Sequence, residues 1–365
     1  FTTLYVGQVQ YFNSRFSKDM TSQQVWCFLP TTALLFLLSV QTFAEVMKSV
    51  SDCDRFLLDQ TPPHVPGILE AGRILDQDRY KFICQTYGNQ RRFVTLYDVR
   101  NRIPVFSAFK FTGEVYGRRP KSVWKIEPQL EDPNGDKKMI PGNGNRTYNH
   151  QAGTVDYRSN RTFDRGHIFP SSYASTKADK MSTFTLTNVV PQAESFNKGS
   201  WNKMERCTKC VMEKYCVNSS GGTGGFVVTG ALPSSSSTLN NRVNVPTALW
   251  SAFCCYSAVA EAWIASGHWG HNVQDESKHK YLKTETLEDL QHRLRRSNSE
   301  FVIFPGSKCP LTTTVTEFYA EMKKKSCLCP PTILDPSPSV SGPSHSHRLM
   351  LLFPFFLFSY HHCVF

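Results

Sequence analysis

Cysteines are the feature that most restricts how this chain can fold. Of its 12 cysteines, Cys27 and Cys363 lie in apolar terminal stretches, which leaves Cys53, Cys84, Cys207, Cys210, Cys216, Cys254, Cys255, Cys309, Cys327 and Cys329. An even number of cysteines in an exported chain predicts disulfide bonds, although spacing alone leaves the pairing open. A zinc site beginning at Cys207-x-x-Cys210 is the alternative, but no second CxxC or paired histidines follow at a usual spacing.

The expectation of export comes from residues near the amino end. Met20 opens "MTSQQVWCFLPTTALLFLLSVQTFAEV", where an apolar run through Leu34–Val40 precedes small residues that end at Ala44. This order is typical of a secretory signal peptide. We therefore predict a signal peptide over residues 20–44, an upstream extension over residues 1–19 and a secreted protein. Sequons compatible with glycosylated surface loops begin at Asn145, Asn160 and Asn218.

The composition changes again after Cys329. We predict one folded domain over residues 45–330, a Pro/Ser-rich linker over residues 331–348 and a hydrophobic tail over residues 349–365. The apolar run in this tail is too short for an ordinary membrane span, and Pro354 interrupts it. A cleaved lipid-anchor signal and a tail without a role both stay open.

Apolar alternation and turn residues divide the domain into mixed elements. Residues 92–115 predict a β-hairpin that turns at Arg100-Asn101-Arg102, and residues 132–161 predict a long exposed loop. Further strands are expected within residues 184–192, 224–232 and 242–265, and helices within residues 197–215 and 284–296.

Charge suggests the kind of partner. With 41 Lys and Arg against 30 Asp and Glu, the formal net charge is +11 at pH 7. Such a surplus favours polyanions such as nucleic acid or an anionic membrane. Many secreted basic proteins bind no polyanion, so charge alone does not choose a function.

The stretch "TFDRGHIFPSS" carries a candidate site. An imidazole suits the removal of a proton from an attacking water, because its pKa lies near neutral pH. A guanidinium offers a planar fork of donors to phosphate oxygens. If this stretch is extended, Arg165 and His167 point to the same face, and Gly166 allows a close backbone approach. The alternative is a structural histidine beside a surface pair, Asp164 and Arg165.

The segment "TLTNVVPQAESFNKGSWNKMER" adds oxygen ligands. If Asn197 opens the predicted helix, Glu205 follows about two turns later on broadly the same side. Oxygen ligands of low total charge suit Mg²⁺, which keeps most of its waters. In the alternative interpretation, Asn197 only caps the helix and Glu205 is a solvated helix residue.

The blocks "DRGH", "TNVVPQ" and "FNKGSWNKME", in this order and spacing, resemble the DNA/RNA non-specific endonuclease family, whose active site is a ββα-metal (His-Me) finger. The resemblance spans roughly Cys53 to Cys329. It implies an α+β fold with a central, mostly antiparallel sheet, flanking helices and the ββα-metal finger.

The resemblance also assigns roles. It implies that His167 is the general base and Asn197 the direct protein ligand of one Mg²⁺, for which Mn²⁺ could substitute. Glu205 would hold metal-bound water, Arg165 would contact the phosphate, and Asn188 would orient metal waters or the phosphate. Asp164 would stabilise the hairpin. The family uses an arginine before the tryptophan, for which this chain offers Arg118, Arg119 and Lys121.

These observations predict a secreted, Mg²⁺-dependent endonuclease that hydrolyses DNA and RNA without reading sequence, with no small-molecule cofactor and an oligomeric state left open. A catalytically weak or inactive extracellular nucleic-acid-binding or interaction protein on the same fold is the second hypothesis. A lectin-like or protease-inhibitor ectodomain is the third, and it leaves the three blocks unexplained. His268 and His271 in "GHWGH" are expected in a loop, because glycines flank them. Trp124 could stack on a base or belong to the core.

Overall fold

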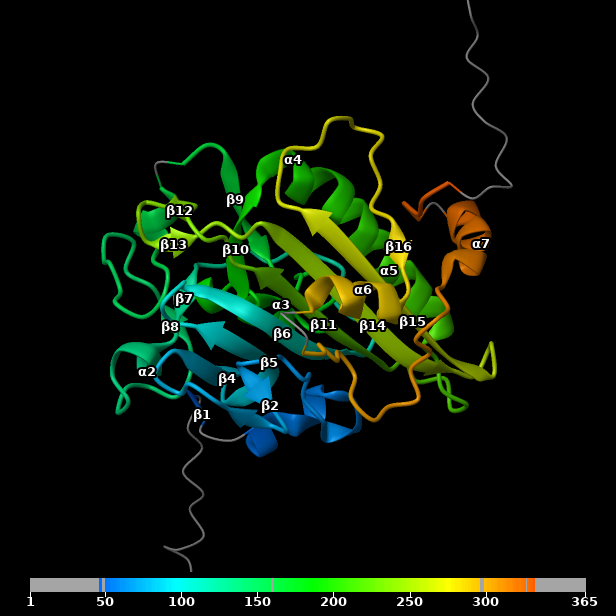
Figure 1. Cartoon of the computed structure of the whole chain (residues 1–365), viewed down its shortest axis with the longest axis horizontal. Coiled ribbons are helices and arrows are strands. Elements are labelled where there is room, and N and C mark those ends of the chain that lie inside the picture. Colours follow the sequence, from blue (N-terminus) through cyan, green and yellow to red (C-terminus); the bar gives the residue numbers. More distant parts are fainter. Residues whose placement is uncertain (1–45, 48–49, 159, 296–298, 326, 332–365) are drawn as a thin grey trace, which may run out of the picture.

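The computed structural model describes residues 46–47, 50–158, 160–295, 299–325 and 327–331 (Figure 1). The predicted upstream extension, signal peptide and hydrophobic tail lie outside the described residues, as does the predicted linker beyond residue 331. Among the described residues, no helix combines the length and the apolar character that crossing a bilayer requires.

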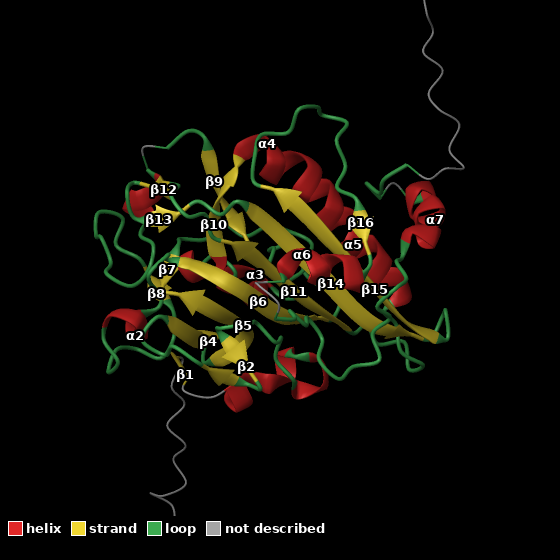
Figure 2. Ribbon diagram, in the orientation of Figure 1, coloured by secondary structure: helices red, strands yellow, loops and turns green. Residues whose placement is uncertain are grey.

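An eight-stranded antiparallel sheet forms the centre of the molecule (Figure 2). In spatial order its strands are β1 (Val46–Met47), β4 (Tyr80–Tyr87), β5 (Gln90–Asp98), β6 (Ile103–Phe111), β11 (Gly225–Leu232), β14 (Ala248–Ser257), β15 (Ala262–His271) and β16 (Thr284–Glu285). The predicted hairpin is confirmed as β5 and β6, which pair antiparallel. The predicted α+β fold with a central antiparallel sheet is confirmed as well.

Shorter elements surround this sheet. The short strands are β2 (Leu69–Glu70), β3 (Arg73–Ile74), β7 (Lys125–Ile126), β8 (Ile140–Pro141), β9 (Phe163–His167), β10 (Val189–Ala193), β12 (Thr238–Leu239) and β13 (Val243–Asn244). The α-helices are α2 (Pro128–Glu131), α3 (Lys177–Ser182), α4 (Glu194–Phe196), α5 (Asn202–Tyr215), α6 (Leu287–Leu294) and α7 (Tyr319–Lys324). The other helical turns are η1 (Val50–Phe56), η2 (Leu58–Gln60), η3 (Thr154–Tyr157), η4 (Leu186–Asn188), η5 (Asn197–Trp201) and η6 (Thr316–Phe318).

The two faces of the sheet carry different layers. Helix α6 and the amino-terminal turns cover one face, and α5 crosses the other (Figure 2). Side chains alternate along β14, so the adjacent residues Cys254 and Cys255 point to opposite faces. Cys254 bonds to Cys309 on the α6 side, and Cys255 bonds to Cys216 on the α5 side. Strand β14 is thus linked covalently to both layers.

All ten cysteines that the sequence analysis singled out form disulfides. The remaining pairs are Cys53–Cys84, Cys207–Cys329 and Cys210–Cys327. The zinc interpretation of Cys207-x-x-Cys210 is therefore wrong, because both sulfurs bond to the carboxyl-terminal segment. That segment is far away in sequence, so local spacing could not reveal the partners.

Two predictions of local structure are corrected. Residues 184–188 form the end of a loop and the turn η4, and the strand of this region begins only at Val189. "GHWGH" is the end of strand β15 and not a loop. Its glycines are required by packing: a Cβ at Gly267 would lie 2.8 Å from Leu290, and one at Gly270 would lie 2.6 Å from Phe196. The interleaved His268 is buried beside Thr284.

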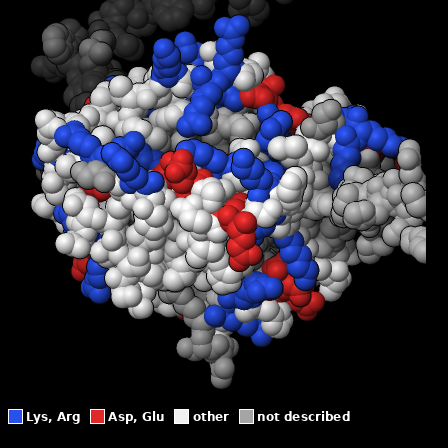
Figure 3. Space-filling view, turned by 90° about the horizontal axis from the view of Figure 1, so that it is seen from above, with Lys and Arg blue, Asp and Glu red and all other residues white. Residues whose placement is uncertain are grey.

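The surplus of positive charge is visible on one face of the molecule. Figure 3 shows this face, seen from above relative to Figure 1, with Lys and Arg side chains spread across it and scattered acidic groups between them. Because polyanions bind through such surfaces, the distribution agrees with the partner class that the net charge favours.

Candidate active site

A small ββα unit carries the "DRGH" motif. Strand β9 pairs antiparallel with β10, so that His167 lies opposite Val189 and Arg165 opposite Pro191. Helices α4 and α5 follow directly and are joined through η5. Gly166 is needed here because a Cβ at this position would lie 2.1 Å from the side-chain oxygen of Gln192. The resulting unit brings the motif and the start of the helix to one cleft of about 800 Å³.

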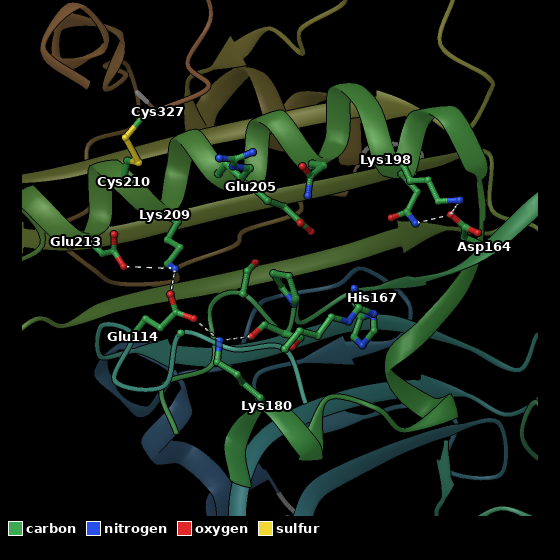
Figure 4. A pocket seen from close by; sticks show the side chains of 18 of the residues that line it. Glu114, Asp164, His167, Lys180, Lys198, Glu205, Lys209, Cys210, Glu213 and Cys327 are labelled. Atoms are coloured by element: carbon green, nitrogen blue, oxygen red, sulfur yellow. Dashed lines mark hydrogen bonds and ion pairs between the residues drawn. A yellow bond between two sulfur atoms is a disulfide. The ribbon is translucent and has the colours of Figure 1, made fainter. Parts of the chain in front are cut away.

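His167 lies on the wall of this cleft opposite α5 (Figure 4). Its ring packs against Trp124 and Phe184, with centroid distances of 5.4 Å and 5.0 Å. The buried Nε2 has no hydrogen-bond partner among the described residues. Burial, helped by the positive charge of Arg119, lowers the pKa of His167 to about 3. The imidazole is therefore neutral near pH 7 and has a nitrogen available to accept a proton.

Asn197 lines the same cleft as His167 and is held by the motif. Its amide nitrogen donates to Asp164 at 2.9 Å, which leaves its carbonyl oxygen available to a ligand. The carboxylate of Asp164 also lies 3.5 Å from the amine of Lys198. Asp164, expected to stabilise the hairpin, therefore also orients the amide of the predicted metal ligand.

The helix that carries Asn197 begins earlier than the sequence suggested. It starts at Glu194, so Asn197 is not its N-cap but the first residue of the π-helical turn η5. Asp275 from a distant loop accepts hydrogen bonds from the backbone and hydroxyl of Ser200 at this turn. A Cβ at Gly199 would lie 2.5 Å from Asp275. Asp275 therefore holds the π-helical turn that begins at Asn197.

Glu205 projects into the cleft from α5. Its carboxylate accepts a hydrogen bond of 3.0 Å from the indole nitrogen of Trp201. Burial raises the pKa of Glu205 to about 8, against the lowering effects of that hydrogen bond and of Arg119. A cation in the cleft would favour the charged carboxylate.

Arg165 lines the cleft between aromatic rings. Its guanidinium lies 5.3 Å from the ring centre of Trp124 and 5.1 Å from that of Tyr157. One donor reaches the carbonyl of Thr154 at 3.3 Å, while the buried Nε has no partner among the described residues. Burial lowers the pKa of Arg165, so a phosphate oxygen would be a favourable partner for its charge.

The three basic candidates that precede Trp124, namely Arg118, Arg119 and Lys121, differ in whether they reach the cleft. All three are exposed, but only Arg119 lines the cleft, with its guanidinium 5.2 Å from the ring centre of Phe184. Arg118 and Lys121 do not line it, so Arg119 is the one candidate of the three that the fold brings to the cleft. Trp124 combines its two interpretations: it is partly buried, packs against His167 and still borders the cleft.

Asn188 does not occupy the predicted place. It is fully buried, and its amide nitrogen donates to the carbonyls of Phe169 and Thr183. Its amide oxygen accepts from the backbone of Phe169 and from the hydroxyl of Ser107. With both ends of the amide used, Asn188 fixes the chain after His167 to the central sheet. It does not line the cleft, which corrects the expectation that it orients metal waters or phosphate.

Sequence reasoning missed the other end of the cleft. Glu114 there pairs with both Lys180 and Lys209, and Lys209 also approaches Glu213 at 3.6 Å (Figure 4). The residues of α5 and its preceding turn that line the cleft recur at helical intervals, a pattern that could have been read from the sequence. They are Asn197, Lys198, Asn202, Glu205, Arg206, Lys209, Cys210 and Glu213. Glu114 carries no such signal, because only the fold brings it to the helix.

The oxygen ligands beside His167 fit a hard divalent cation. We name the end of the cleft that holds Arg165, His167, Asn197 and Glu205 the catalytic end. The available groups are the amide oxygen of Asn197 and the carboxylate of Glu205, and both line a cleft open to water. Among the described residues, no cluster of three or more His, Cys, Asp or Glu side chains could hold a metal by itself. A site of this kind suits an ion such as Mg²⁺ that keeps several waters.

The match to a family model agrees with this geometry. The model of the DNA/RNA non-specific endonuclease family matches residues 75–295. The chain belongs to this family. The matched range of this nuclease family contains β9, β10 and α5, and therefore each cleft residue that the sequence predicted.

Individual relatives show how far the similarity extends. The human Endonuclease domain-containing 1 protein is 31% identical over 229 residues, which are 61% of this chain and 42% of that protein. The mouse protein of the same name is 30% identical over 237 residues, with 63% and 44% covered. A protein of Nostoc sp. called "Nuclease" is 29% identical over 131 residues, with 35% and 43% covered. The chain thus spans less than half the length of these relatives.

A solved structure of the EndoG/EndoGI complex aligns with 63% of this chain and 90% of its own, at a TM-score of 0.43 and 18% sequence identity.

Proposed function

We propose that this protein is a secreted, divalent-metal-dependent endonuclease that hydrolyses phosphodiester bonds of DNA and RNA without sequence preference. One observation carries the proposal: His167, whose Nε2 has no hydrogen-bond partner among the described residues, and Asn197, whose amide is held by Asp164, line the same cleft among basic side chains. Membership of the nuclease family supports the reaction class. Five disulfides support an oxidising compartment.

The side chains have separable roles in this proposal. The neutral His167 accepts a proton at Nε2 from the water that attacks phosphorus. Arg165 and Arg119 donate to phosphate oxygens and stabilise the negative charge that develops on them. These contacts go to the backbone of the strand, so they position a substrate without reading its bases.

Asn197 and Glu205 would hold the metal, the first directly and the second through water. A bound Mg²⁺ or Mn²⁺ would stabilise negative charge on the phosphoryl and leaving oxygens. Asp164 keeps the carbonyl of Asn197 turned toward the cleft by engaging its amide nitrogen. Trp201 fixes the carboxylate of Glu205 from the side of the helix.

Plasmid and RNA cleavage tests the proposal. The purified chain is incubated with supercoiled DNA and with RNA in Mg²⁺, Mn²⁺ or EDTA, beside His167→Ala and the exposed control His279→Ala. We expect cleavage of both substrates with metal, no cleavage in EDTA, and a rate about 10²- to 10⁴-fold lower in His167→Ala only. Wild-type protein that binds nucleic acid but cleaves neither substrate at any pH or metal concentration would favour the binding-protein hypothesis instead.

A further inference from the structure

The far end of the cleft is walled by residues beyond the matched family range. We name residues 315–325 and 327–329 the C-terminal strap; they follow the matched range, which ends at residue 295. The strap contains η6 and α7 and lies beside the end of α5 (Figure 1). Lys325 and Cys327 of the strap line the cleft together with Cys210 and Glu213 of α5. An added segment thus completes the cleft of the nuclease core.

The strap is fixed to the core by covalent and packing contacts. Disulfides join it to α5 at two positions one turn apart, through Cys207–Cys329 and Cys210–Cys327. The rings of Phe318 and Tyr215 stack with centroids 4.0 Å apart. The buried strap residues Val315, Tyr319 and Met322 pack into the same apolar cluster as α5. The position of Lys325 at the cleft is therefore set by the fold.

Two cations of the cleft, Arg206 between its two ends and Lys325 on the strap, have no acidic partner among the described residues. Lys180 and Lys209 both pair with Glu114, and Lys209 also approaches Glu213. Arg206 and Lys325 are exposed, line the cleft and form no ion pair with any described residue. The cleft as a whole is lined by seven Lys and Arg against four Asp and Glu. Beyond Arg119 and Arg165 beside His167, a negatively charged ligand would therefore find free cations at Arg206 and Lys325.

The length of the cleft fits a strand and exceeds a single phosphate. The cleft-lining residues Asn202 and Glu213 lie eleven residues apart on α5, which corresponds to about 16 Å at the rise of an α-helix. One strand of duplex DNA advances about 3.4 Å per nucleotide, so this length corresponds to roughly five nucleotides. Arg206 is positioned between the catalytic end and the strap.

We propose that Arg206 and Lys325 form a distal phosphate-binding subsite for the same nucleic-acid strand that His167 cleaves, with the strap supplying one of its two cations. The inference rests on the proposed function. It specifies where the cleft would contact the strand at phosphates several nucleotides away from the scissile bond. Glu114 forms ion pairs with the neighbouring Lys180 and Lys209. The positive charge available to a phosphate at this subsite is therefore that of Arg206 and Lys325.

Strand binding tests the subsite without requiring cleavage. The dissociation constant of a labelled 15-nucleotide DNA strand is measured with Mg²⁺ over a series of salt concentrations, in the His167→Ala background. Lys325→Gln and Arg206→Gln are compared with Lys324→Gln, which removes the same charge from an exposed neighbour outside the cleft lining. We expect each subsite variant to raise the dissociation constant about two- to fivefold and to lower the salt slope by about one.

The control decides between a site and general charge. Equal dissociation constants and salt slopes for Lys325→Gln and Lys324→Gln would overturn the proposal, because net charge alone would then explain binding. Failure of the proposed function has a different signature, namely wild-type protein that cleaves neither plasmid nor RNA while the variants still differ in strand binding. Wild-type protein that neither cleaves nor binds would refute both.

Discussion

Different interactions stabilise the two ends of the cleft. At the catalytic end, His167 and Arg165 are packed among aromatic rings, and burial shifts their pKa values. At the strap end, Lys209 pairs with Glu114 and Glu213, the exposed Lys325 forms no ion pair with another described residue, and the chain is fixed by disulfides. Desolvated groups respond to close packing and pH, whereas exposed charges respond to salt. In the proposed function, the comparison separates the residues assigned to chemistry from those assigned to holding a strand.

The largest effect is expected from disrupting the close contact between β9 and β10 in the ββα unit. In Gly166→Ala the added Cβ would meet the side chain of Gln192 at 2.1 Å, so β9 must move away from β10. We expect the free energy of unfolding to fall by about 3 kcal/mol and cleavage to be lost. Gly117→Ala is the control, because this glycine also lines the cleft but a Cβ there meets nothing within 4 Å. Equal urea midpoints for the two variants would contradict the prediction.

A smaller effect is expected from releasing the amide of Asn197. Asp164→Ala removes the hydrogen bond that orients it, so the Mg²⁺ concentration for half-maximal cleavage should rise about 10- to 100-fold. Glu194→Ala is a matched control, since Glu194 also pairs with Lys198 but makes no bond to Asn197. A metal titration of plasmid cleavage measures both. The same shift in the two variants would assign the effect to Lys198 instead.

Removing one of the two disulfides of the strap should lower strand affinity at the strap end and leave the catalytic end unchanged. In Cys210→Ser/Cys327→Ser, the neighbouring Cys207–Cys329 bond still closes nearly the same loop. We therefore expect a loss of only about 1–2 kcal/mol in the free energy of unfolding, below the usual range for a disulfide. Strand affinity should fall while the Mg²⁺ requirement of cleavage stays unchanged. An increased Mg²⁺ requirement with unchanged strand affinity would reverse the assignment of the two ends.

The smallest effect concerns pH, because water in the open cleft screens the charge of Glu205. Burial raises its pKa from 4.5 to about 8, so without metal the native protein keeps a proton that the unfolded chain releases. The free energy of unfolding should fall as pH rises from about 5 to 8. Glu205→Gln should lose this part of the slope. Urea unfolding in EDTA at both pH values measures it, and identical slopes for wild type and variant would contradict the assignment.

The catalytic end could be predicted because its residues are close in sequence. Arg165 and His167 alternate on one strand, and Asn197 and Glu205 lie on one continuous helical segment, so periodicity places each pair on one side. The family resemblance supplied their roles. Asn188 shows the limit of this reasoning. Its position in a polar block looked functional, but only packing reveals that both ends of its amide are used inside the protein.

The strap end could not be predicted because its contacts join distant segments. Glu114 meets Lys209 across 95 positions, and Cys210 meets Cys327 across 117. Arg119 could not be separated from Arg118 and Lys121 in sequence, because its packing on Phe184 selects it. The hairpin of β5 and β6 followed from alternation and the central sheet from the family resemblance, whereas the glycines of β15 misled because close packing, and not a turn, requires them.

The adjacent cysteines of β14 have a consequence for folding in an oxidising environment. A slip of this strand by one position would exchange the faces of Cys254 and Cys255, and each thiol would then meet the partner of the other. Oxidation in the correct alignment therefore makes that alignment permanent. A chain that oxidises out of alignment is trapped as a disulfide isomer, which separates from the native form by peptide mapping under non-reducing conditions.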